Sequence, residues 1–322
     1  MQKLFLLFSG PTAVGKTDFV NRLTDQAPEL FAIINGDMGQ LYTPLSIGTA
    51  KPDWKNQAVA HYLFDVIEKP HNYTVSEYRQ AVVQCLEKVW SAGKIPIIVG
   101  GSGFYLKSLF FPPQDLDFKY TPEEVVNVNL KNNEQKTPQE LWQELYAIDP
   151  ERATTIHMHD VYRVERALTI WYTTGIKPSE AGPLYTPPGN YIFLHLTRER
   201  EELYTRINAR TKLMIEQGWI DEVKSLSSAW RSFLREKRLI GYPEIIEFLE
   251  DSISKQELVE SISMQTRAYA KRQETFWKSL KKQLVQSDTE QVYLKHINEV
   301  NLTLSNVDLY LKQLLSIVKS LN

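Results

Sequence analysis

The residues with the most definite chemistry lie in the segment from Gly10 to Thr17, close to the start of the chain. The segment fits the pattern G-x-x-x-x-G-K-[ST], with an apolar run before it and a helical pattern after it. Glycines let the backbone curl so that several N–H groups face one anion, and the helix N-terminus and Lys16 add positive charge. The Thr17 hydroxyl is suited to binding Mg²⁺, so we expect this cofactor with Thr17 as its ligand. The predicted diphosphate- or triphosphate-binding residues are Gly10, Pro11, Thr12, Ala13, Val14, Gly15, Lys16 and Thr17.

Two further polar side chains follow apolar runs. Many phosphoryl-transfer enzymes carry a metal-binding Asp directly after such a strand. Here the run Ile95–Val99 leads instead into a second glycine-rich turn with no carboxylate, in which Ser102 supplies a hydroxyl. The acid at a strand exit near the loop is Asp37, which is either a functional carboxylate or a turn and cap residue. These residues alone leave a nucleotide kinase or NTPase open.

The elements that must position these residues alternate along the first third of the chain. Short apolar runs at 4–8, 31–34 and 95–99 predict strands, and helical patterns begin at about Lys16 and span 75–92. Continuous apolar strands separated by helices indicate a parallel sheet covered on both faces. The predicted fold class is therefore α/β, with a P-loop NTPase-like parallel sheet as its core.

The middle of the chain interrupts this pattern. From about Pro112 to Pro150 the residues Asp, Asn, Gln, Glu and Pro dominate, which predicts an inserted, mostly helical subdomain. Beyond it we expect a helix at about 160–173, a strand at 191–196 and a largely helical region to about 282 with breaks at Gly218 and at 241–243. A short strand at 291–295 and a last amphipathic helix complete the expected order. The predicted parts are 1–111 for the first part of the core, 112–150 for the insert, and 151–322 for the core completion and helical C-terminal region.

Composition excludes several classes of protein. The 322 residues include 37 Lys and Arg against 39 Asp and Glu, so the formal net charge is −2, and 43% are hydrophobic. These values exclude a disordered or collagen-like chain and argue against a uniformly basic nucleic-acid binder. Cys85 is the single cysteine, which excludes an intramolecular disulfide. No apolar run approaches the ~18–20 residues that span a bilayer, so we expect no membrane contact and a cytoplasmic location.

A series of short motifs continues from about residue 3 to 282. They are Gly10–Thr17, Asp37-x-x-Gln40-Leu41-Tyr42, Ile47-Gly48-Thr49-Ala50-Lys51-Pro52, Gly100-Gly101-Ser102-Gly103-Phe104-Tyr105, Arg163-x-x-Arg166-Ala167-Leu168, Thr174-Gly175-x-x-Pro178-Ser179, Arg198-Glu199-x-x-x-Leu203-x-x-Arg206-Ile207, Ile240-Gly241-Tyr242-x-Glu244 and Thr266-Arg267-x-Tyr269-Ala270-Lys271-Arg272-Gln273. In order and spacing this set resembles the tRNA dimethylallyltransferase family of the bacterial type, also called tRNA isopentenyltransferases. The ordered set is far more specific than the P-loop alone.

The resemblance implies a reaction. Such enzymes transfer a dimethylallyl group from dimethylallyl diphosphate to the exocyclic N6 amine of the adenosine 3′ of the anticodon, in tRNAs that read UNN codons. By similarity Asp37 is the base that takes the proton of the amine, and Ser102 lies near the transfer site. An arginine stabilises the departing diphosphate; we choose Arg210, with Arg206, one helical turn away, as the alternative. The expected partners are dimethylallyl diphosphate and a tRNA anticodon stem-loop, and the expected oligomeric state is a monomer.

The resemblance also implies RNA contacts. Between Ser261 and Lys282 the chain carries six cations against one acid, Glu274. Such a stripe suits phosphates, although a solvated surface helix is the alternative. The family's insert clasps the anticodon stem, and no residue of 112–150 can be assigned. The residues expected to bind tRNA are Asp37, Met38, Gly39, Gln40, Arg163, Arg166, Arg238, Gly241, Tyr242, Arg267, Lys271 and Arg272.

Some positions depart from the family pattern. Ser102 replaces the usual Thr, Met38 replaces Ser, and Gly39 stands where a larger, often basic residue is common. Tyr62 replaces one of two paired His, and Pro243 interrupts a motif. These departures affect the expected RNA contacts more than the chemistry. Two other functions remain as alternatives: a P-loop kinase of a small molecule or nucleotide, and a non-catalytic RNA-binding relative.

Overall fold

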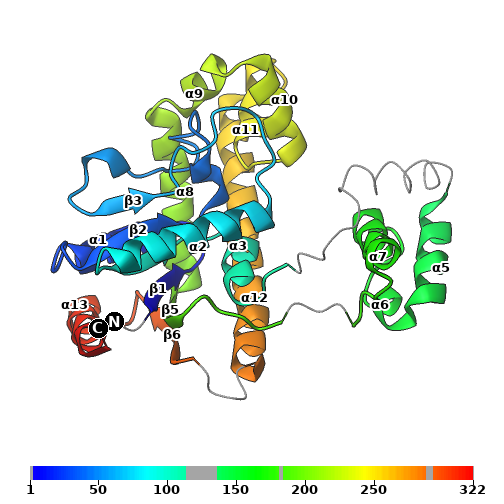
Figure 1. Cartoon of the computed structure of the whole chain (residues 1–322). Helices are drawn as coiled ribbons and strands as arrows, with labels where there is room; N and C mark the ends of the chain where they lie inside the picture. The colour runs from blue at the N-terminus through cyan, green and yellow to red at the C-terminus, as the bar shows by residue number, and fades with distance from the viewer. Residues whose placement is uncertain (1–2, 114–135, 181–183, 288–292, 322) are drawn as a thin grey trace. The chain divides into compact units, whose positions relative to one another are not determined.

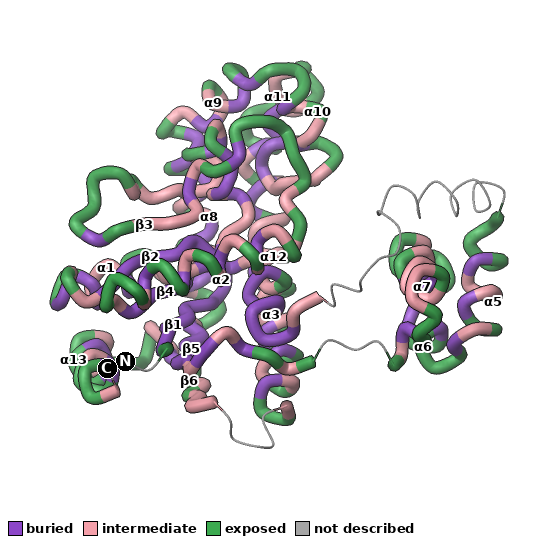
Figure 2. Tube along the Cα trace, viewed as in Figure 1, coloured by how far each residue is buried: buried purple, intermediate pink, exposed green. Residues whose placement is uncertain are grey.

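Six strands form one sheet in the order β3-β2-β4-β1-β5-β6, and every neighbouring pair is parallel (Figure 1). The computed structural model describes residues 3–113, 136–180, 184–287 and 293–321. The strands are β1 (Leu4–Ser9), β2 (Phe31–Asn35), β3 (Ala60–Tyr62), β4 (Ile95–Val99), β5 (Asn190–Thr197) and β6 (Lys295–Asn301). The four central strands β2, β4, β1 and β5 are almost wholly buried, as Figure 2 shows in purple. The predicted parallel α/β fold is confirmed.

Helices cover both faces of the sheet, which explains why its central strands are continuously apolar. Leu4, Leu6 and Phe8 of β1 belong to a core cluster that includes side chains from α1 (Lys16–Thr24), α8 (Arg200–Glu216) and α13 (Val307–Leu321). Phe5 points the other way and meets Phe110 of α3 (Gly103–Phe110), with ring centroids 6.4 Å apart. Helix α2 (Val75–Ser91) begins in a capping box formed by Thr74 and Glu77.

The C-terminal half of the larger unit is mainly helical, as predicted. After α8 come α9 (Trp219–Ser225), α10 (Ser228–Lys237), α11 (Tyr242–Leu249) and the long α12 (Lys255–Ser287). The predicted breaks lie at Gly218 and Gly241, the residues before α9 and α11. Their φ values of 101° and 92° are not helical, so each glycine separates two helices. Short 3₁₀ turns occupy Met38–Leu41 and Trp54–Asn56.

The strand predictions failed at the two edges of the sheet. No strand was predicted at β3, which has three residues and is not buried. The last strand was expected at 291–295 but spans Lys295–Asn301. Residues 291 and 292 of the expected strand lie outside the described part of the chain. Both β3 and β6 are edge strands, so their side chains are largely polar or exposed and lack the apolar run that indicates a buried strand.

Residues 111–184 form a second compact unit, and residues 1–110 with 185–322 form the first. The described helices of the second unit are α5 (Pro138–Ile148), α6 (Pro150–Thr154) and α7 (Val161–Thr174). They share a small core that includes Leu145, Ala153 and Leu168. The predicted insert ended at 150, whereas the second unit continues to Leu184 because α7 packs its apolar face on α5. Residues 114–135 of the predicted insert lie outside the described residues.

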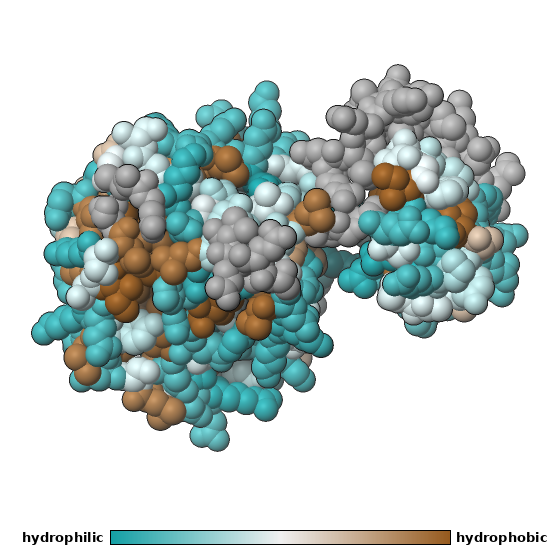
Figure 3. All heavy atoms as spheres, turned by 60° about the horizontal axis from the view of Figure 1, so that its bottom comes forward, coloured by the Kyte–Doolittle hydropathy of each residue, from teal (hydrophilic) through white to brown (hydrophobic). Residues whose placement is uncertain are grey.

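Apolar side chains are exposed at several places on the larger unit. Figure 3 shows brown hydrophobic areas on one face of the larger unit, separated by teal hydrophilic surface. Exposed apolar residues of this unit include Phe104, Leu304 and Leu309. Within the described ranges, no helix combines the length and the apolar character needed to cross a membrane.

Candidate active site

The candidate residues gather because they follow neighbouring strands at the same edge of the sheet. Asp37 follows β2, Ser102 follows β4, the P-loop follows β1 and Arg198 follows β5. These strands lie side by side in the order β2-β4-β1-β5. The carboxyl ends of parallel strands are the usual ligand site of open α/β sheets.

The P-loop connects β1 to α1, and two of its backbone carbonyls accept hydrogen bonds from the Lys16 ammonium. Lys16 Nζ donates to Gly10 O at 2.9 Å and to Pro11 O at 3.0 Å. Burial lowers the pKa of Lys16 to about 8, although the carboxylate of Asp37 acts to raise it. A phosphate group near Nζ would stabilise the charged form and replace these carbonyls as its partner.

Asp37 is held in a fixed orientation by its neighbours. Its Oδ1 accepts a hydrogen bond from Gly39 N at 3.2 Å and thereby caps the 3₁₀ turn Met38–Leu41. The side chain of the fully buried Asn35 accepts from Asp37 N and donates to Asp37 O, both at 2.9 Å. Asp37 is therefore a cap residue, but one whose Oδ2 has no hydrogen bond to the described residues.

The charge of Asp37 is influenced by two cations. Burial raises the pKa of the Asp37 carboxyl, while Lys16, the Gly39 N–H and Arg210 act to lower it. Lys16, Thr17, Asp37 and Gln40 line one cavity, whose walls also include apolar side chains such as Ile33. The Asp37 carboxylate and the Lys16 ammonium thus line one cavity that is partly shielded from water, and the Arg210 guanidinium is close enough for its charge to act on Asp37.

Ser102 connects the second glycine-rich turn to the segment of Asp37. Its Oγ accepts a hydrogen bond from Met38 N at 2.8 Å, and its backbone N–H donates to Gly36 O at 3.3 Å. The hydroxyl proton of Ser102 is therefore available to a ligand. The Ser102 side chain therefore lies beside the Asp37 segment, and its expected role near the transfer site stays a prediction.

The two candidate arginines of α8 have different surroundings. Arg206 is exposed, and its Nε donates to Ala13 O of the P-loop at 2.9 Å. Arg210 is less exposed, and burial lowers the pKa of its guanidinium, which the charge of Asp37 acts to raise. The geometry therefore favours Arg210 as the cation of the reaction centre and Arg206 as a support of the loop.

Gln273 of α12 is a site residue that the sequence analysis did not single out. Its Oε1 accepts from Thr12 N at 2.9 Å, and its Nε2 donates to Gly101 O at 2.9 Å. One side chain thus joins the P-loop to the second glycine-rich turn. The motif Thr266–Gln273 contained this residue, but an amide at a helix position carries no signature of such a bridge.

The next residue of α12 is tied to the sheet. Glu274 Oε1 and His195 Nε2 are 3.2 Å apart, and His195 Nδ1 lies 2.7 Å from Ser9 Oγ at the end of β1. His195 is buried and stacks on Trp277, with ring centroids 4.4 Å apart. These contacts set the rotation of α12 and, through it, the position of the Gln273 side chain.

The residues after Asp37 pack tightly. Gly39 is buried, and a Cβ there would stand 2.8 Å from Thr49 Cγ2, so a larger residue would displace Thr49. Gln40 Nε2 donates to Thr49 O and Ala50 O at 3.1 and 3.3 Å, which leaves its Oε1 for other partners. Gly39 thus packs directly against the Thr49 side chain.

The residues predicted to bind tRNA around α11 differ in accessibility. Arg238 is exposed in a left-handed conformation at the end of α10. Tyr242 is fully buried, and its hydroxyl donates to Glu222 Oε1 at 2.9 Å. Glu222 also accepts from the backbone N–H groups of residues 46–48. Gly241 is buried too, so Gly241 and Tyr242 support the 46–48 loop from inside, and any effect on RNA would be indirect.

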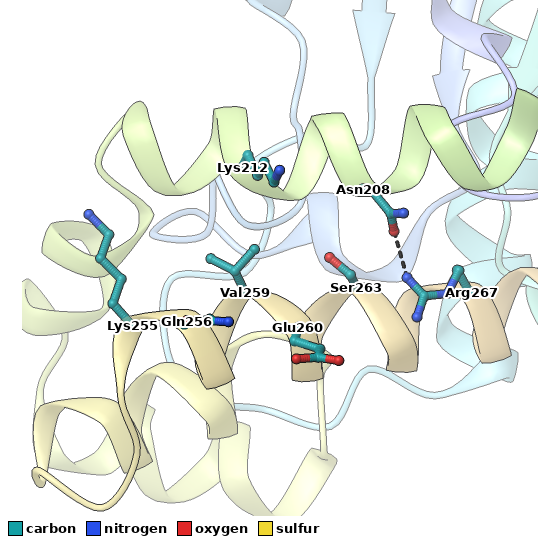
Figure 4. A pocket seen from close by; sticks show the side chains of 8 residues that line it. All are labelled: Asn208, Lys212, Lys255, Gln256, Val259, Glu260, Ser263 and Arg267. Carbon is teal, nitrogen blue, oxygen red and sulfur yellow. Dashed lines mark hydrogen bonds between the residues drawn. The ribbon is translucent and has the colours of Figure 1, made fainter.

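The basic residues of α12 lie in two environments. Arg267 lines a groove of about 650 Å³ between α8 and α12, where its Nη1 donates to Asn208 Oδ1 at 2.6 Å (Figure 4). The groove also contains Lys212, Lys255 and Glu260. Lys271 and Arg272 are exposed instead, and the Arg272 guanidinium lies 5.6 Å from the centre of the Tyr269 ring.

Arg163 and Arg166 belong to the second unit. Both are exposed on α7, and Arg163 forms an ion pair of 3.1 Å with Asp160, the residue that caps this helix. Their charges therefore lie on the surface of that unit.

The P-loop residues suit a metal ion that is bound jointly by a protein oxygen and by phosphate oxygens of a ligand. In the described ranges no group of three or more His, Cys, Asp or Glu could bind a metal ion by itself. Thr17 offers a hydroxyl oxygen on the wall of the Lys16 and Asp37 cavity. A hard cation such as Mg²⁺ accepts one or two protein oxygens together with phosphate oxygens, so Thr17 fits this role.

Comparisons with known proteins agree with the sequence resemblance. The IPP transferase family model matches residues 40–280. A tRNA dimethylallyltransferase of Alkaliphilus metalliredigens is 37% identical over 290 residues, which are 86% of this chain and 89% of the relative. One from Bacillus mycoides is 36% identical over 286 residues, or 84% of this chain and 85% of the relative. The crystal structure of the full-length tRNA isopentenylpyrophosphate transferase from Bacillus halodurans is similar at a TM-score of 0.64 and 26% identity, over 99% of this chain and 96% of that one. The chain belongs to the IPP transferase family.

Proposed function

We propose that the chain transfers the dimethylallyl group of dimethylallyl diphosphate to tRNA, at the exocyclic N6 amine of the adenosine 3′ of the anticodon. The products are N6-(dimethylallyl)adenosine and diphosphate, and the expected substrates are tRNAs that read UNN codons. The relatives named tRNA dimethylallyltransferase support the transfer to tRNA. The reacting nitrogen and its position 3′ of the anticodon are what the family resemblance implies.

The observation that carries this proposal is that the Asp37 carboxylate lies under the influence of two cations, Lys16 and Arg210. A carboxylate with a pKa raised by burial is a better base than an exposed one. The two cations that influence it are the groups that a departing diphosphate needs. The site therefore combines a proton acceptor and an anion receptor within one cavity.

In the proposed reaction, the amine nitrogen attacks the first carbon of the dimethylallyl group as the bond from that carbon to the diphosphate oxygen breaks. The nitrogen loses one proton, which Asp37 accepts, and the electron pair of the broken bond leaves with the diphosphate. Ser102 can donate its hydroxyl proton to a substrate atom beside Asp37, since its oxygen already accepts from Met38 N.

The leaving diphosphate gains negative charge in the transition state. We assign its stabilisation to the P-loop N–H groups of residues 10–17, the Lys16 ammonium and the Arg210 guanidinium. Mg²⁺, when bound through Thr17 and phosphate oxygens, would neutralise part of the same charge. Preorganised donors in a site shielded from water are well suited to this task.

The RNA must present one unstacked base to this cavity. We assign the contacts with its anticodon stem-loop to exposed cations, namely Arg163, Arg166, Arg238, Lys271 and Arg272, with Arg267 in the α8–α12 groove. A base that leaves the stack can reach a site that a paired base cannot. The Met38–Gln40 segment beside Asp37 would contact this base, with Gln40 Oε1 as an acceptor.

A kinase is disfavoured by the turn after β4. Residues 100–105 all lie in the described part of the chain and contain no carboxylate for a metal ion. The family membership favours transfer of a prenyl group instead.

The test is a transfer assay. The chain is incubated with Mg²⁺, labelled dimethylallyl diphosphate and a tRNA that reads UNN codons, and label in the RNA is measured. We expect transfer by the wild type and a loss of about 10²–10⁴-fold in Asp37→Asn. Asp25→Asn is the matched control, because Asp25 is an exposed aspartate at the C-terminal end of α1. Absence of transfer by the wild type, or equal transfer by Asp37→Asn, would refute the proposal.

A further inference from the structure

A large apolar ring lies exposed next to the reaction centre. Phe104, in the first turn of α3, is 65% exposed. Its ring meets the ring of Phe276 on α12, with centroids 5.0 Å apart and planes at 65°. Burying such a ring is favourable, so an exposed one at a site is a candidate contact surface.

The two rings are fixed relative to the catalytic segments. A Cβ at Gly103 would stand 2.6 Å from Phe276 Cδ1, so α3 and α12 approach as closely as the glycine allows. Phe104 is two residues after Ser102, whose hydroxyl accepts from Met38 N beside Asp37. Phe276 is three residues after Gln273, which binds both glycine-rich segments. The ring pair therefore has a set position beside the cavity of Asp37.

A cation lies beside the pair. Arg272 is one helical turn before Phe276 and therefore on the same side of α12, and it is exposed. Its guanidinium lies 5.6 Å from the centre of the Tyr269 ring. The surface thus offers a flat apolar face beside a positive charge, which matches a nucleobase attached to a phosphate backbone.

We propose that Phe104, supported from the side by Phe276, is a stacking surface for an unpaired RNA base next to the adenosine that reacts. The inference rests on the proposed function and deepens it. A base that swings out of an anticodon loop leaves its neighbours without a stacking partner, and an aromatic ring can take that place. Stacking on a ring tolerates any base, so this contact supports binding without selecting sequence.

The experiment is a double-mutant cycle between protein and RNA. Wild type and Phe104→Ala are assayed on an anticodon stem-loop and on two variants that lack the base on the 5′ or the 3′ side of the reactive adenosine. We expect Phe104→Ala to raise KM for the intact RNA about tenfold and to leave KM for dimethylallyl diphosphate unchanged. Loss of one flanking base should raise KM for the wild type and should have little further effect in Phe104→Ala.

Two protein variants complete the test. Phe104→Trp should restore the wild-type KM, because it keeps an aromatic face. Val285→Ala, which removes another exposed side chain of α12, should leave KM unchanged. Wild-type KM in Phe104→Ala, or additive effects at both flanking positions, would overturn the stacking proposal. Absence of transfer by the wild type would instead overturn the proposed function.

Discussion

The carboxylate of Glu274 and the imidazole of His195 are 3.2 Å apart, and this contact joins α12 to β5 next to Ser9, the residue before the P-loop. Because a carboxylate only accepts hydrogen bonds, Nε2 carries the proton, and Ser9 Oγ at 2.7 Å donates to Nδ1 when the ring is neutral. Gln273, the neighbour of Glu274, holds Thr12 N and Gly101 O. The sheet thus fixes the helix that holds the two glycine-rich segments together.

This relationship predicts a difference between two variants of Glu274. Glu274→Leu removes the acceptor of the His195 proton and should lower the free energy of unfolding by about 1–3 kcal/mol. Glu274→Gln keeps an oxygen in the same place and should lose less. Urea unfolding measures both, and KM for dimethylallyl diphosphate should rise more in Glu274→Leu, because Gln273 loses its support. Equal stability of the two variants would contradict the role of this contact.

The rate of transfer should fall on the acid side at a pH above the ordinary range of an aspartate. Burial raises the pKa of Asp37 from its ordinary value of 3.8, so its carboxylate gains a proton at a higher pH. A protonated Asp37 cannot accept the proton of the amine, so kcat/KM decreases as pH falls through this pKa. Arg210 acts to lower this pKa, so Arg210→Ala should move the acid limb to higher pH, whereas Arg210→Lys should not. A limb that stays in place in Arg210→Ala would show that Arg210 does not influence Asp37.

The two arginines of α8 should differ in their effect on kcat. Arg210→Ala removes a cation whose charge acts on the Asp37 carboxyl, and kcat should fall by about 10²–10³-fold, as when one preorganised donor is lost. Arg206→Ala removes a hydrogen bond from an exposed side chain to Ala13 O of the P-loop, and kcat should fall much less. Initial rates at saturating substrates decide between them, and a larger loss in Arg206→Ala would reverse the assignment.

Lys51 and Asp65 form a buried ion pair, with side chains that are 3% and 17% exposed. Lys51→Met leaves the carboxylate without its cation, so the free energy of unfolding should fall by about 3–5 kcal/mol. The double variant Lys51→Met/Asp65→Asn removes both charges and should recover part of the loss. Asn also tolerates the left-handed conformation of residue 65, where φ is 53°. The thermal or urea midpoint reports this, and a double variant less stable than Lys51→Met would contradict it.

Residues at the ends of buried strands could be predicted from the sequence. The P-loop, Asp37 and Ser102 each follow an apolar run, and parallel strands bring such positions together. The choice of Arg210 over Arg206 had no support in the sequence pattern, because residues one helical turn apart share a face. Only the observed surroundings, Ala13 O for one and Asp37 for the other, separate them.

Contacts between distant segments were beyond prediction. Gln273 reaches Thr12 and Gly101 across 261 and 172 residues of chain, and no local pattern encodes such a contact. The end of the insert was also missed, because α7 is an ordinary amphipathic helix and only its packing on α5 assigns it to the second unit. Tyr242 was expected by similarity to bind tRNA, but its side chain is fully buried.

The chain leaves the first unit after α3 and re-enters it before β5. At this point Thr186 N donates to Phe110 O at 2.7 Å. A chain that exits and re-enters at one hydrogen-bonded step can lengthen, shorten or exchange the segment between without disturbing the sheet. Evolution could therefore vary this segment while the residues at the strand ends stayed as they are. In the same way, an engineer could replace residues 111–184 by a short linker and ask what the core retains.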